Sequence, residues 1–537
     1  MSIARRQLLK GSSAAGAALV AGLAAPTSAA AAPTPLLQST PHRLGAPSVS
    51  GIHLQFGNDP SGEMTVSWIT PQSVRHPHVR VGSPDGGLGR VVEAETRTYR
   101  DALSKDEVYV HHARLTGLRA ATTYLYAAGH DGANPETGSF TTAPRGRAAF
   151  TFTSFGDQGT PNLRRKVEFP DGVPSPLGKY PVYTSSQIGS PASADIVAAV
   201  ERVGPLFNLV NGDLCYASYS GRHGQSRTGT WADWFISNSR STRLRPWMPC
   251  AGNHETESGN GPIGALGYQT YFDLPESAAS ADEETAGMWY AFTVGAVRFI
   301  SLANEDVAIQ NSSEIYLRGY SGGAQERWLE RELRAARNSR AIDWIVVCMH
   351  HPMISTSKHG SGSDLGIREA WGPLFDEYGV DLVVSGHEHY YERSHPVRGT
   401  LPNDVRTPVP SGTDPDFADT DHGTVHMVIG AGGNAATTQD DLFETKQGRV
   451  VVALEPKPAP GAPYRESVWV TEDAPWAAVQ DREHTHGFAA FDVDPGDRRG
   501  GRTRMKVTYY TFDGPHGDLT PVDTFTLERS RADAWDD

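Results

Sequence analysis

The stretch VDLVVSGHEH, residues 380–389, decides the fold of this 537-residue chain. Its apolar run predicts a strand that ends at Gly386, and His387 and His389 follow at once. Open sheets bind ligands outside the carboxyl ends of their strands, so both histidines lie where a binding crevice would form. Gly386 leaves room for the backbone and a bound metal to approach each other closely.

Four more strand-like runs end in polar signatures of the same kind. They are AAFTFTSF before Gly156-Asp157, LFNLVN before Gly212-Asp213, PWMPCA before Gly252-Asn253-His254-Glu255, and IDWIVVCM before His350. A single Gly-Asp after a strand is usually a turn, and a single histidine is more often structural than a ligand. Five such strand ends in one chain can instead bring their side chains to one crevice.

Helical stretches lie between these strands. One is predicted over Ser193–Arg202, and another follows Ser321, which is its predicted N-cap. Strands that alternate with helices in this way indicate an α/β or α+β catalytic domain, which we place at residues 145–537.

Residues 47–144 are predicted to form a separate all-β domain. Short alternating runs recur there between Gly, Pro, Asp and Asn residues, as in a β-sandwich. The runs are Ile52–Phe56, Met64–Ile69, Val79–Val81, Val108–Leu115, Thr122–Ala127 and Ser139–Thr142. Residues 33–46 carry Pro and Ser without periodicity and are predicted to be a linker.

Residues 1–32 have the three regions of an export signal. Arg5-Arg6 and Lys10 are basic, a weakly apolar Ala/Gly/Leu run follows, and small residues suited to cleavage end the segment. The segment resembles a twin-arginine signal, which implies that the protein is exported in the folded state and is secreted. The alternative is a disordered Ala-rich tail that carries two arginines by chance.

Composition excludes several classes of function. The net charge is −14, and loss of the basic signal would make the chain more acidic, which argues against nucleic-acid or anionic-lipid binding through bulk charge. Past the signal, no stretch approaches the roughly 20 apolar residues of a membrane span. Cys215, Cys250 and Cys348 lack the paired spacing of zinc sites, so we expect buried thiols, and the sequence leaves one disulfide open.

The ordered series GDQG, GDLCY, GNHE, VCMH and GHEH resembles the five-block signature of the metallophosphoesterases. Within that superfamily, Tyr216, three residues after Asp213, is similar to the iron-binding tyrosine of the purple acid phosphatases. The resemblance implies a four-layer αββα sandwich preceded by a fibronectin type III-like β-sandwich, to which LTGLRAATTYLYAAG is similar. It also implies a hydrolase of phosphate esters with two metal ions.

The family pattern implies a complete set of metal ligands in this chain. They are Asp157, Tyr216 and His389 for Fe(III), Asn253, His350 and His387 for a divalent ion (Zn, Mn or Fe), and Asp213 as the bridge between the two ions. Carboxylate and phenolate oxygens suit Fe(III), whereas imidazoles and an amide oxygen suit the divalent ions.

The resemblance also implies residues that contact the substrate. His254 matches the family histidine that binds phosphate and protonates the leaving group, and His359 matches the first of two neighbouring substrate-site histidines, the second being replaced by Gly360. Arg393 is a candidate phosphate contact, with a supporting salt bridge as the alternative. We expect His351 to be a satisfied structural histidine, with tuning of the adjacent ligand as the alternative.

The implied function is an acid phosphatase that hydrolyses small phosphate monoesters by in-line attack of a metal-bound hydroxide. A phosphodiesterase or phospholipase-like enzyme on the same core is the alternative. A non-catalytic binding protein is a distant third, because the ligand set is intact. The sequence leaves the oligomeric state open.

Four long polar or Pro/Gly-rich inserts interrupt the catalytic pattern. They are residues 160–192, 219–230, 399–423 and 434–485. Loops of this length are usually functional lids or disordered segments, and the sequence leaves both alternatives open.

Overall fold

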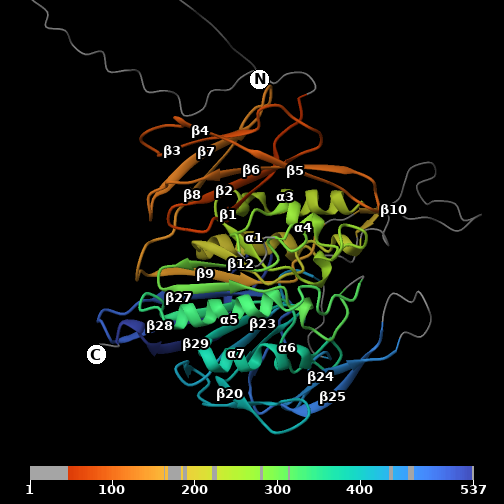
Figure 1. The fold of residues 1–537 in the computed structure, drawn as a ribbon, viewed down its shortest axis with the longest axis vertical. Helices are drawn as coiled ribbons and strands as arrows, with labels where there is room; N and C mark the ends of the chain where they lie inside the picture. Colours follow the sequence, from red (N-terminus) through yellow and green to blue (C-terminus); the bar gives the residue numbers. More distant parts are fainter. Residues whose placement is uncertain are drawn as a thin grey trace, which may run out of the picture.

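In the computed structural model, the chain forms an N-terminal β-sandwich followed by two larger sheets with helices on their outer faces (Figure 1). The structure describes residues 46–534 except 162–163, 167–182, 186–189, 220–225, 278–281, 313–314, 435–439 and 457–464. The predicted signal, and the predicted linker apart from its last residue, therefore lie outside the described residues. Among the described helices, none combines the length and the apolar character that a membrane crossing requires.

The N-terminal sandwich consists of two antiparallel four-stranded sheets. In sheet order, the strands are β1 (Ser50–Phe56), β2 (Met64–Thr70), β6 (Glu107–Leu115) and β5 (Glu95–Arg100), then β4 (Arg90–Glu93), β3 (His78–Gly82), β7 (Thr123–Gly129) and β8 (Glu136–Thr141). The sequence pattern misses β4 and β5. Both are edge strands made mostly of exposed residues, so they lack the apolar alternation of a half-buried strand.

Two seven-stranded sheets form the centre of the catalytic part. The first, in sheet order, contains β13 (Trp247–Pro249), β12 (Phe207–Val210), β9 (Phe150–Phe155), β27 (Gly487–Asp494), β28 (Arg502–Phe512), β29 (Leu519–Ser530) and β22 (Phe417–Asp419). The second contains β14 (Tyr290–Val294), β15 (Val297–Ser301), β16 (Trp344–Cys348), β18 (Leu382–Ser385), β23 (Val425–Ile429), β19 (Tyr391–Ser394) and β26 (Ala477–Gln480). The second sheet has a parallel core, β15, β16, β18 and β23, flanked by antiparallel strands. In the first sheet, the parallel strands β13, β12 and β9 lie at one edge, and β27 continues the sheet antiparallel to β9.

The two sheets pack face to face through a cluster of phenylalanines. Phe152 and Phe207 of the first sheet meet Phe299 of the second edge to face, with ring centroids 5.0 and 5.1 Å apart. Edge-to-face pairs at this separation are the favoured geometry for aromatic rings, and all three side chains are fully buried. This contact fixes the distance between the sheets and therefore between their strand ends.

Helices cover the outer faces of both sheets. They are α1 (Ala192–Val203), α3 (Arg227–Thr242), α4 (Leu266–Tyr271), α5 (Ala324–Arg337), α6 (Leu365–Ala370) and α7 (Gly372–Tyr378). In Figure 1, α1 and α3 lie between the N-terminal sandwich and the first sheet, whereas α5, α6 and α7 lie on the other side. This order of helices, sheet, sheet and helices confirms the predicted α/β metallophosphoesterase fold.

Two helix ends differ from the sequence expectation. Helix α5 begins at Ala324 with Gly323 in the N-cap position, two residues after the predicted Ser321. The Ser321 hydroxyl still accepts the N–H of Gln325 in the first turn at 3.4 Å, and it donates to Asp306. Helix α3 begins inside the insert 219–230, where the side chain of Ser226 accepts the N–H of Gly229 and caps the helix.

Parts of the other inserts are also ordered strands. In the insert 434–485, β24 (Gln447–Leu454) and β25 (Ser467–Asp473) pair as an antiparallel ribbon, and β24 adds to β17 (Ser363–Asp364). Shorter ribbons are β10 (Arg164–Lys166) with β11 (Tyr183–Ser185), and β20 (Val397–Thr400) with β21 (Pro408–Pro410). At these residues, the inserts therefore form regular strands.

Asp273 joins the N-terminal sandwich to the catalytic part. Its carboxylate, only 5% exposed, accepts hydrogen bonds from Arg97 at 2.6 Å, from Arg114 at 2.7 Å and from Thr65 at 3.0 Å, all three in the sandwich. Burial alone would raise the pKa of Asp273, but Arg114, together with His112 and Arg97, holds it well below its usual range.

Asp273→Asn should therefore weaken the joint between the two parts. We expect a loss of about 2 kcal/mol in the free energy of unfolding at pH 7, because hydrogen bonds to a charged group are lost. A carboxyl with a lowered folded pKa stabilises the protein above its unfolded pKa of roughly 3.9, and this contribution disappears as the pH falls through the folded value. Wild type and variant should thus converge in acid.

Urea unfolding of both proteins across pH measures this difference. Glu330→Gln is the control, because Glu330 forms an exposed ion pair with Arg334 that should contribute at most about 0.5 kcal/mol. A difference between wild type and Asp273→Asn that stays constant into acid would contradict the electrostatic account.

Candidate metal centre

The predicted site residues meet at the carboxyl ends of five parallel strands. Asp157, Asp213 and Asn253 follow β9, β12 and β13 in the first sheet, which are paired in parallel. His350 and His387 follow β16 and β18, which are neighbours in the second sheet. Because the sheets are packed face to face, these ends form two walls of one site.

Three predicted ligands form a first group. The hydroxyl of Tyr216 lies 3.0 Å from Oδ1 of Asp157 and 3.0 Å from Nε2 of His389, and His389 Nε2 lies 3.3 Å from the same Asp157 oxygen. Asp157 and Tyr216 are buried, and His389 is partly buried. The structure therefore brings together the residues that the sequence assigned to the ferric ion.

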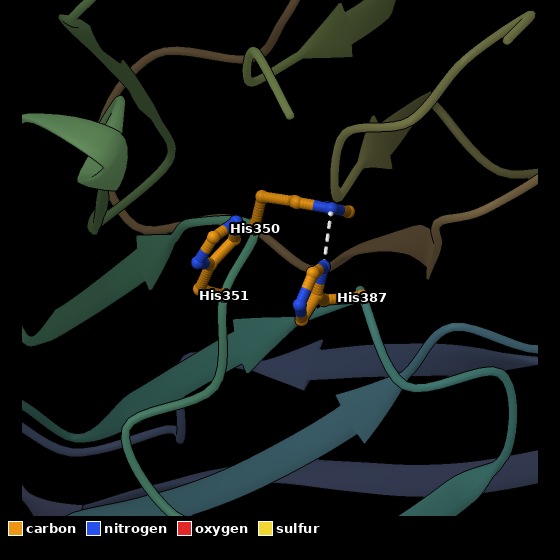
Figure 2. A group of neighbouring side chains, drawn as sticks. All are labelled: His350, His351 and His387. Atoms are coloured by element: carbon orange, nitrogen blue, oxygen red, sulfur yellow. Dashed lines mark hydrogen bonds between the residues drawn. The ribbon is translucent and has the colours of Figure 1, made fainter. Parts of the chain in front are cut away.

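Three other predicted ligands form a second group. Oδ1 of Asn253 lies 2.9 Å from Nε2 of His350 and 3.0 Å from Nδ1 of His387, and these two ring nitrogens are 3.2 Å apart (Figure 2). The structure therefore also brings together the residues assigned to the divalent ion.

Asp213 lies between the two groups. Its Oδ2 is 3.1 Å from Nε2 of His350, and it shares a cluster of donor atoms within 4.8 Å of one another with Asp157 and His350. Burial raises the pKa of Asp213, but His350, then His254, outweigh burial and hold it far below its usual range. The carboxylate is thus ionised and adjacent to both groups, as a bridging ligand must be.

The hydrogen bonds around the second group leave lone pairs facing one another. Nδ1 of His350 lies 2.8 Å from the backbone carbonyl of Asn211, so it donates its proton there and leaves a lone pair on Nε2. Nε2 of His387 lies 3.3 Å from Oε1 of Gln310, which likewise places the lone pair on Nδ1. Two imidazole lone pairs and the Asn253 oxygen converge, an arrangement that a cation stabilises and that fits a metal ion.

In the absence of a cation, protons would have to take its place. Burial lowers the pKa of His350, but the carboxylates of Asp213 and Asp157 outweigh burial and raise it to about 10. Burial, followed by Asp157 and Asp213, raises the pKa of Tyr216 well above its usual value. Buried acids and bases that perturb one another this strongly mark a functional site.

Backbone strain is concentrated at the same residues. Asp157, Asp213, Tyr216 and His387 have φ angles of 54°, 50°, 60° and 71°, in the left-handed region that residues other than glycine rarely adopt. They are half of the residues other than glycine for which the described structure has a positive φ. Such strain persists only where the surrounding structure holds it in place, and it clusters at functional sites.

Glutamate 255 holds the strained turn at Asp213, a role that the sequence signature did not reveal. Its carboxylate accepts the backbone N–H groups of Asp213, Leu214 and Gly252 at 2.8 to 2.9 Å. A Cβ at Gly252 would collide with the Asp213 carboxylate and with His350, so only glycine fits there. Glu255 and Gly252 together explain why the GNHE signature accompanies the GD signature.

His254 lies beside the donor groups with its ring in a defined orientation. Its Nδ1 is 2.8 Å from the hydroxyl of Ser218, its Nε2 is 3.9 Å from Oδ2 of Asp213, and its ring packs against that of Tyr216 at 4.4 Å. It therefore contacts the predicted bridging ligand and is not among the donor atoms of the two groups. Ser218 is a further residue that the sequence analysis did not identify.

The two other predicted substrate residues lie differently. His359 is exposed on the loop before β17, and among the described residues its side chain has no hydrogen bond or ion pair. Arg393 is buried, pairs with Asp523 at 2.7 Å and stacks on Phe525 at 3.9 Å, so its prediction as a phosphate contact gives way to the salt-bridge alternative. At Gly360 a Cβ would collide with Glu388, which explains why no second histidine is found there.

His351 corrects another expectation. Its ring stacks on that of His387, with centroids 4.0 Å apart and an angle of 20° between the planes (Figure 2). Its Nε2 lies 3.6 Å from Oε1 of Glu305, which is too far for a hydrogen bond. Within the described part of the chain, both of its ring nitrogens are buried without a hydrogen-bond partner, so the prediction of a satisfied histidine is wrong. Its contact with His387 supports the alternative role of orienting the ligand.

The fold and this donor set together define a metallophosphoesterase. Residues 49–142 match the N-terminal domain of purple acid phosphatases, and residues 189–391 match the calcineurin-like phosphoesterases. An uncharacterised protein of Mycobacterium tuberculosis is 52% identical over 525 residues, which cover 96% of this chain and 95% of that protein. The chain belongs to the purple acid phosphatase family.

Two further comparisons agree. The Fe(3+)-Zn(2+) purple acid phosphatase 12 of Arabidopsis thaliana is 25% identical over 402 residues, covering 74% of this chain and 75% of that protein. The solved structure of a purple acid phosphatase from yellow lupin seeds covers 91% of this chain and 76% of that one, with a TM-score of 0.62 at 20% identity, and supports the fold. The protein is thus a phosphoester hydrolase from a family that uses a dinuclear metal centre.

Asp213→Asn should remove more metal than any other single change at the site. A bridging carboxylate contacts both ions, so we expect the content to fall from about two metals per chain to below one. Metal analysis of purified protein measures it. Asp343→Asn is the control, because Asp343 is an equally buried carboxylate that pairs with Arg147 instead. If Asp213→Asn kept two metals and ordinary turnover, Asp213 would not be the bridge.

Proposed function

We propose that this protein is an exported acid phosphatase that hydrolyses small phosphate monoesters. In the proposal, Fe(III) is bound by Asp157, Tyr216 and His389, and a divalent Zn, Mn or Fe ion by Asn253, His350 and His387. The observation that carries the proposal is the convergence of two donor groups on the single carboxylate of Asp213. Export rests on the twin-arginine-like sequence of residues 1–32.

The two donor groups differ in the kind of ion they suit. A buried carboxylate and a phenol offer hard, anionic oxygens, whereas two neutral imidazoles and an amide oxygen are a softer set. Burial, followed by the neighbouring carboxylates, raises the pKa of Tyr216 and so opposes its ionisation. A strongly charged ion such as Fe(III) supplies the opposing field that a phenolate ligand needs.

Two metal ions held by these residues would bind phosphate oxygens and activate water for in-line attack. The chain itself supplies the proton for the leaving group. With Ser218 donating to Nδ1 of His254, the remaining ring proton is on Nε2, the nitrogen that faces Asp213 and the site. The contact between His254 and Tyr216 keeps the ring in that orientation.

Tyr216→Phe tests the ferric assignment through colour. A phenolate bound to Fe(III) should give a visible charge-transfer band, and loss of the hydroxyl should abolish it while the fold remains. Tyr126→Phe is the matched control, because Tyr126 is also fully buried but its hydroxyl donates to the carbonyl of Arg243. Absorption and circular dichroism spectra of the three proteins decide: an unchanged band in Tyr216→Phe excludes Tyr216 as the ligand.

His254→Ala tests the source of the proton. General acid catalysis contributes roughly 10²–10⁴-fold and matters most for poor leaving groups. The variant should therefore lose far more kcat/KM on an alkyl phosphate than on p-nitrophenyl phosphate, with unchanged metal content. An equal loss on both esters would limit His254 to phosphate binding, and a lost metal would make it a ligand.

A further inference from the structure

Four arginines of the described structure stack on aromatic rings, and two of them differ from the others. Arg334 and Arg393 also pair with carboxylates, Glu330 and Asp523. The other two are Arg449, 4.5 Å above the ring of Trp469, and Arg465, 5.4 Å above the ring of Tyr316. Neither has a carboxylate within ion-pair distance in the part of the chain that is described, and the Nε of each is buried without a hydrogen-bond partner.

Unpaired guanidinium groups are conspicuous in this chain. It carries 62 acidic and 48 basic residues, so carboxylates are plentiful. A half-buried guanidinium without an anion loses hydration and gains no ion pair in return. For Arg449, burial lowers the pKa, and the nearby Glu388 carboxylate only partly offsets this. Both arginines are thus prepared to accept an anion that the described residues do not provide.

Arg449 lies next to the strand end that bears His387 and His389. A Cβ on Gly362 would lie 2.9 Å from Cγ of Arg449, so the arginine stem packs against this glycine. The N–H of Gly362 donates to Glu388 at 2.5 Å, and Glu388 stands between the two predicted ligands. Glu388 also accepts from Ser357 and Tyr390, which accounts for its carboxylate without an ion pair to Arg449.

Arg465 is connected to the opposite side of the site. Its backbone carbonyl accepts a hydrogen bond from the side chain of Asn311 at 2.6 Å. The next residue, Ser312, donates from its hydroxyl to the backbone carbonyl of Asn253 at 3.2 Å. Arg465 is thus linked through two neighbouring residues to a predicted ligand of the divalent ion.

The aromatic partners of the two guanidinium groups are themselves partly exposed. Trp469 is 41% exposed, and its indole N–H donates to the carbonyl of Ser361 at 3.2 Å, which fixes the ring beside the loop that carries His359. Tyr316 is 39% exposed. Stacking uses the face of a guanidinium and leaves its N–H edge available for bidentate binding of an anion.

We propose that Arg449 and Arg465 form an anion subsite beside the metal centre, which binds a second phosphate group of the substrate. The proposal rests on the proposed phosphatase function and narrows it to phosphate esters whose leaving group carries another phosphate. Both arginines lie on the ribbon that β24 and β25 form (Figure 1): Arg449 of β24 is paired with Thr471 of β25, and Arg465 stands six residues before Thr471. Two guanidinium groups match the two charges of a phosphate monoester.

The test compares an alkanediol bisphosphate with the alkyl phosphate of the same chain length, over a series of lengths. Wild type should prefer the bisphosphate, and Arg449→Gln and Arg465→Gln should each reduce this preference in kcat/KM about tenfold, mainly through KM. Rising salt should reduce the preference as well. Arg449→Lys keeps the charge and should retain more of the preference than Arg449→Gln.

Arg334→Gln is the matched control, because Arg334 also stacks on an aromatic ring, that of Tyr378, but at the exposed face of α5. The preference of this variant for the bisphosphate should equal that of wild type. Metal content and the visible spectrum of each variant identify any that is misfolded. The subsite would be contradicted if active wild type showed no preference for the bisphosphate, or if the arginine variants lost equal kcat/KM on both esters. Either result would leave the proposed phosphatase function standing. Wild type that hydrolyses neither ester would overturn the proposed function, and the subsite with it.

Discussion

The buried carboxylate of Asp213 is the group on which both halves of the site depend. Its carboxylate contacts His350 and shares a cluster of donor atoms with Asp157. Its strained backbone is held by Glu255, which accepts three backbone N–H groups in and beside that turn. A negative charge buried this deeply is costly unless cations surround it. The lone pairs that converge beside it, the raised pKa of His350 and the strain at Tyr216 and His387 are consequences of the same requirement for a metal.

The fold serves this requirement by fixing two rows of strand ends at a constant separation. Phe152, Phe207 and Phe299 lock the sheets together through edge-to-face contacts. Rigid elements hold ligands more precisely than loops do, because their side chains cannot drift with the backbone. The β24–β25 ribbon carries Arg449, whose stem packs against Gly362, and Arg465 stands just before β25. In the proposed account, chemistry and specificity thus reside on different elements.

Much of the fold, and the residues that meet at the candidate site, could be predicted from the sequence, because the signals are local. Apolar runs that end in Gly-Asp or Gly-His identify the strands and the predicted ligands together, whereas the sequence pattern misses β4 and β5 because exposed edge strands lack apolar alternation. The partners that orient the ligands could not be predicted. Gln310, Ser218 and the ring of His351 reach the site through contacts between separate segments. The sequence could not decide between the two alternatives for Arg393, because its salt-bridge partner Asp523 is 130 residues away.

Anomalous X-ray diffraction from crystals of the metal-loaded protein, recorded at the absorption edge of iron and of each candidate divalent metal, tests the central claim most directly. The account predicts two peaks per chain roughly 3.5–4 Å apart, with Asp213 in contact with both. Iron should lie against Asp157, Tyr216 and His389, and the second metal against the group that contains Asn253. A single peak, or two peaks that do not share Asp213, would contradict the account.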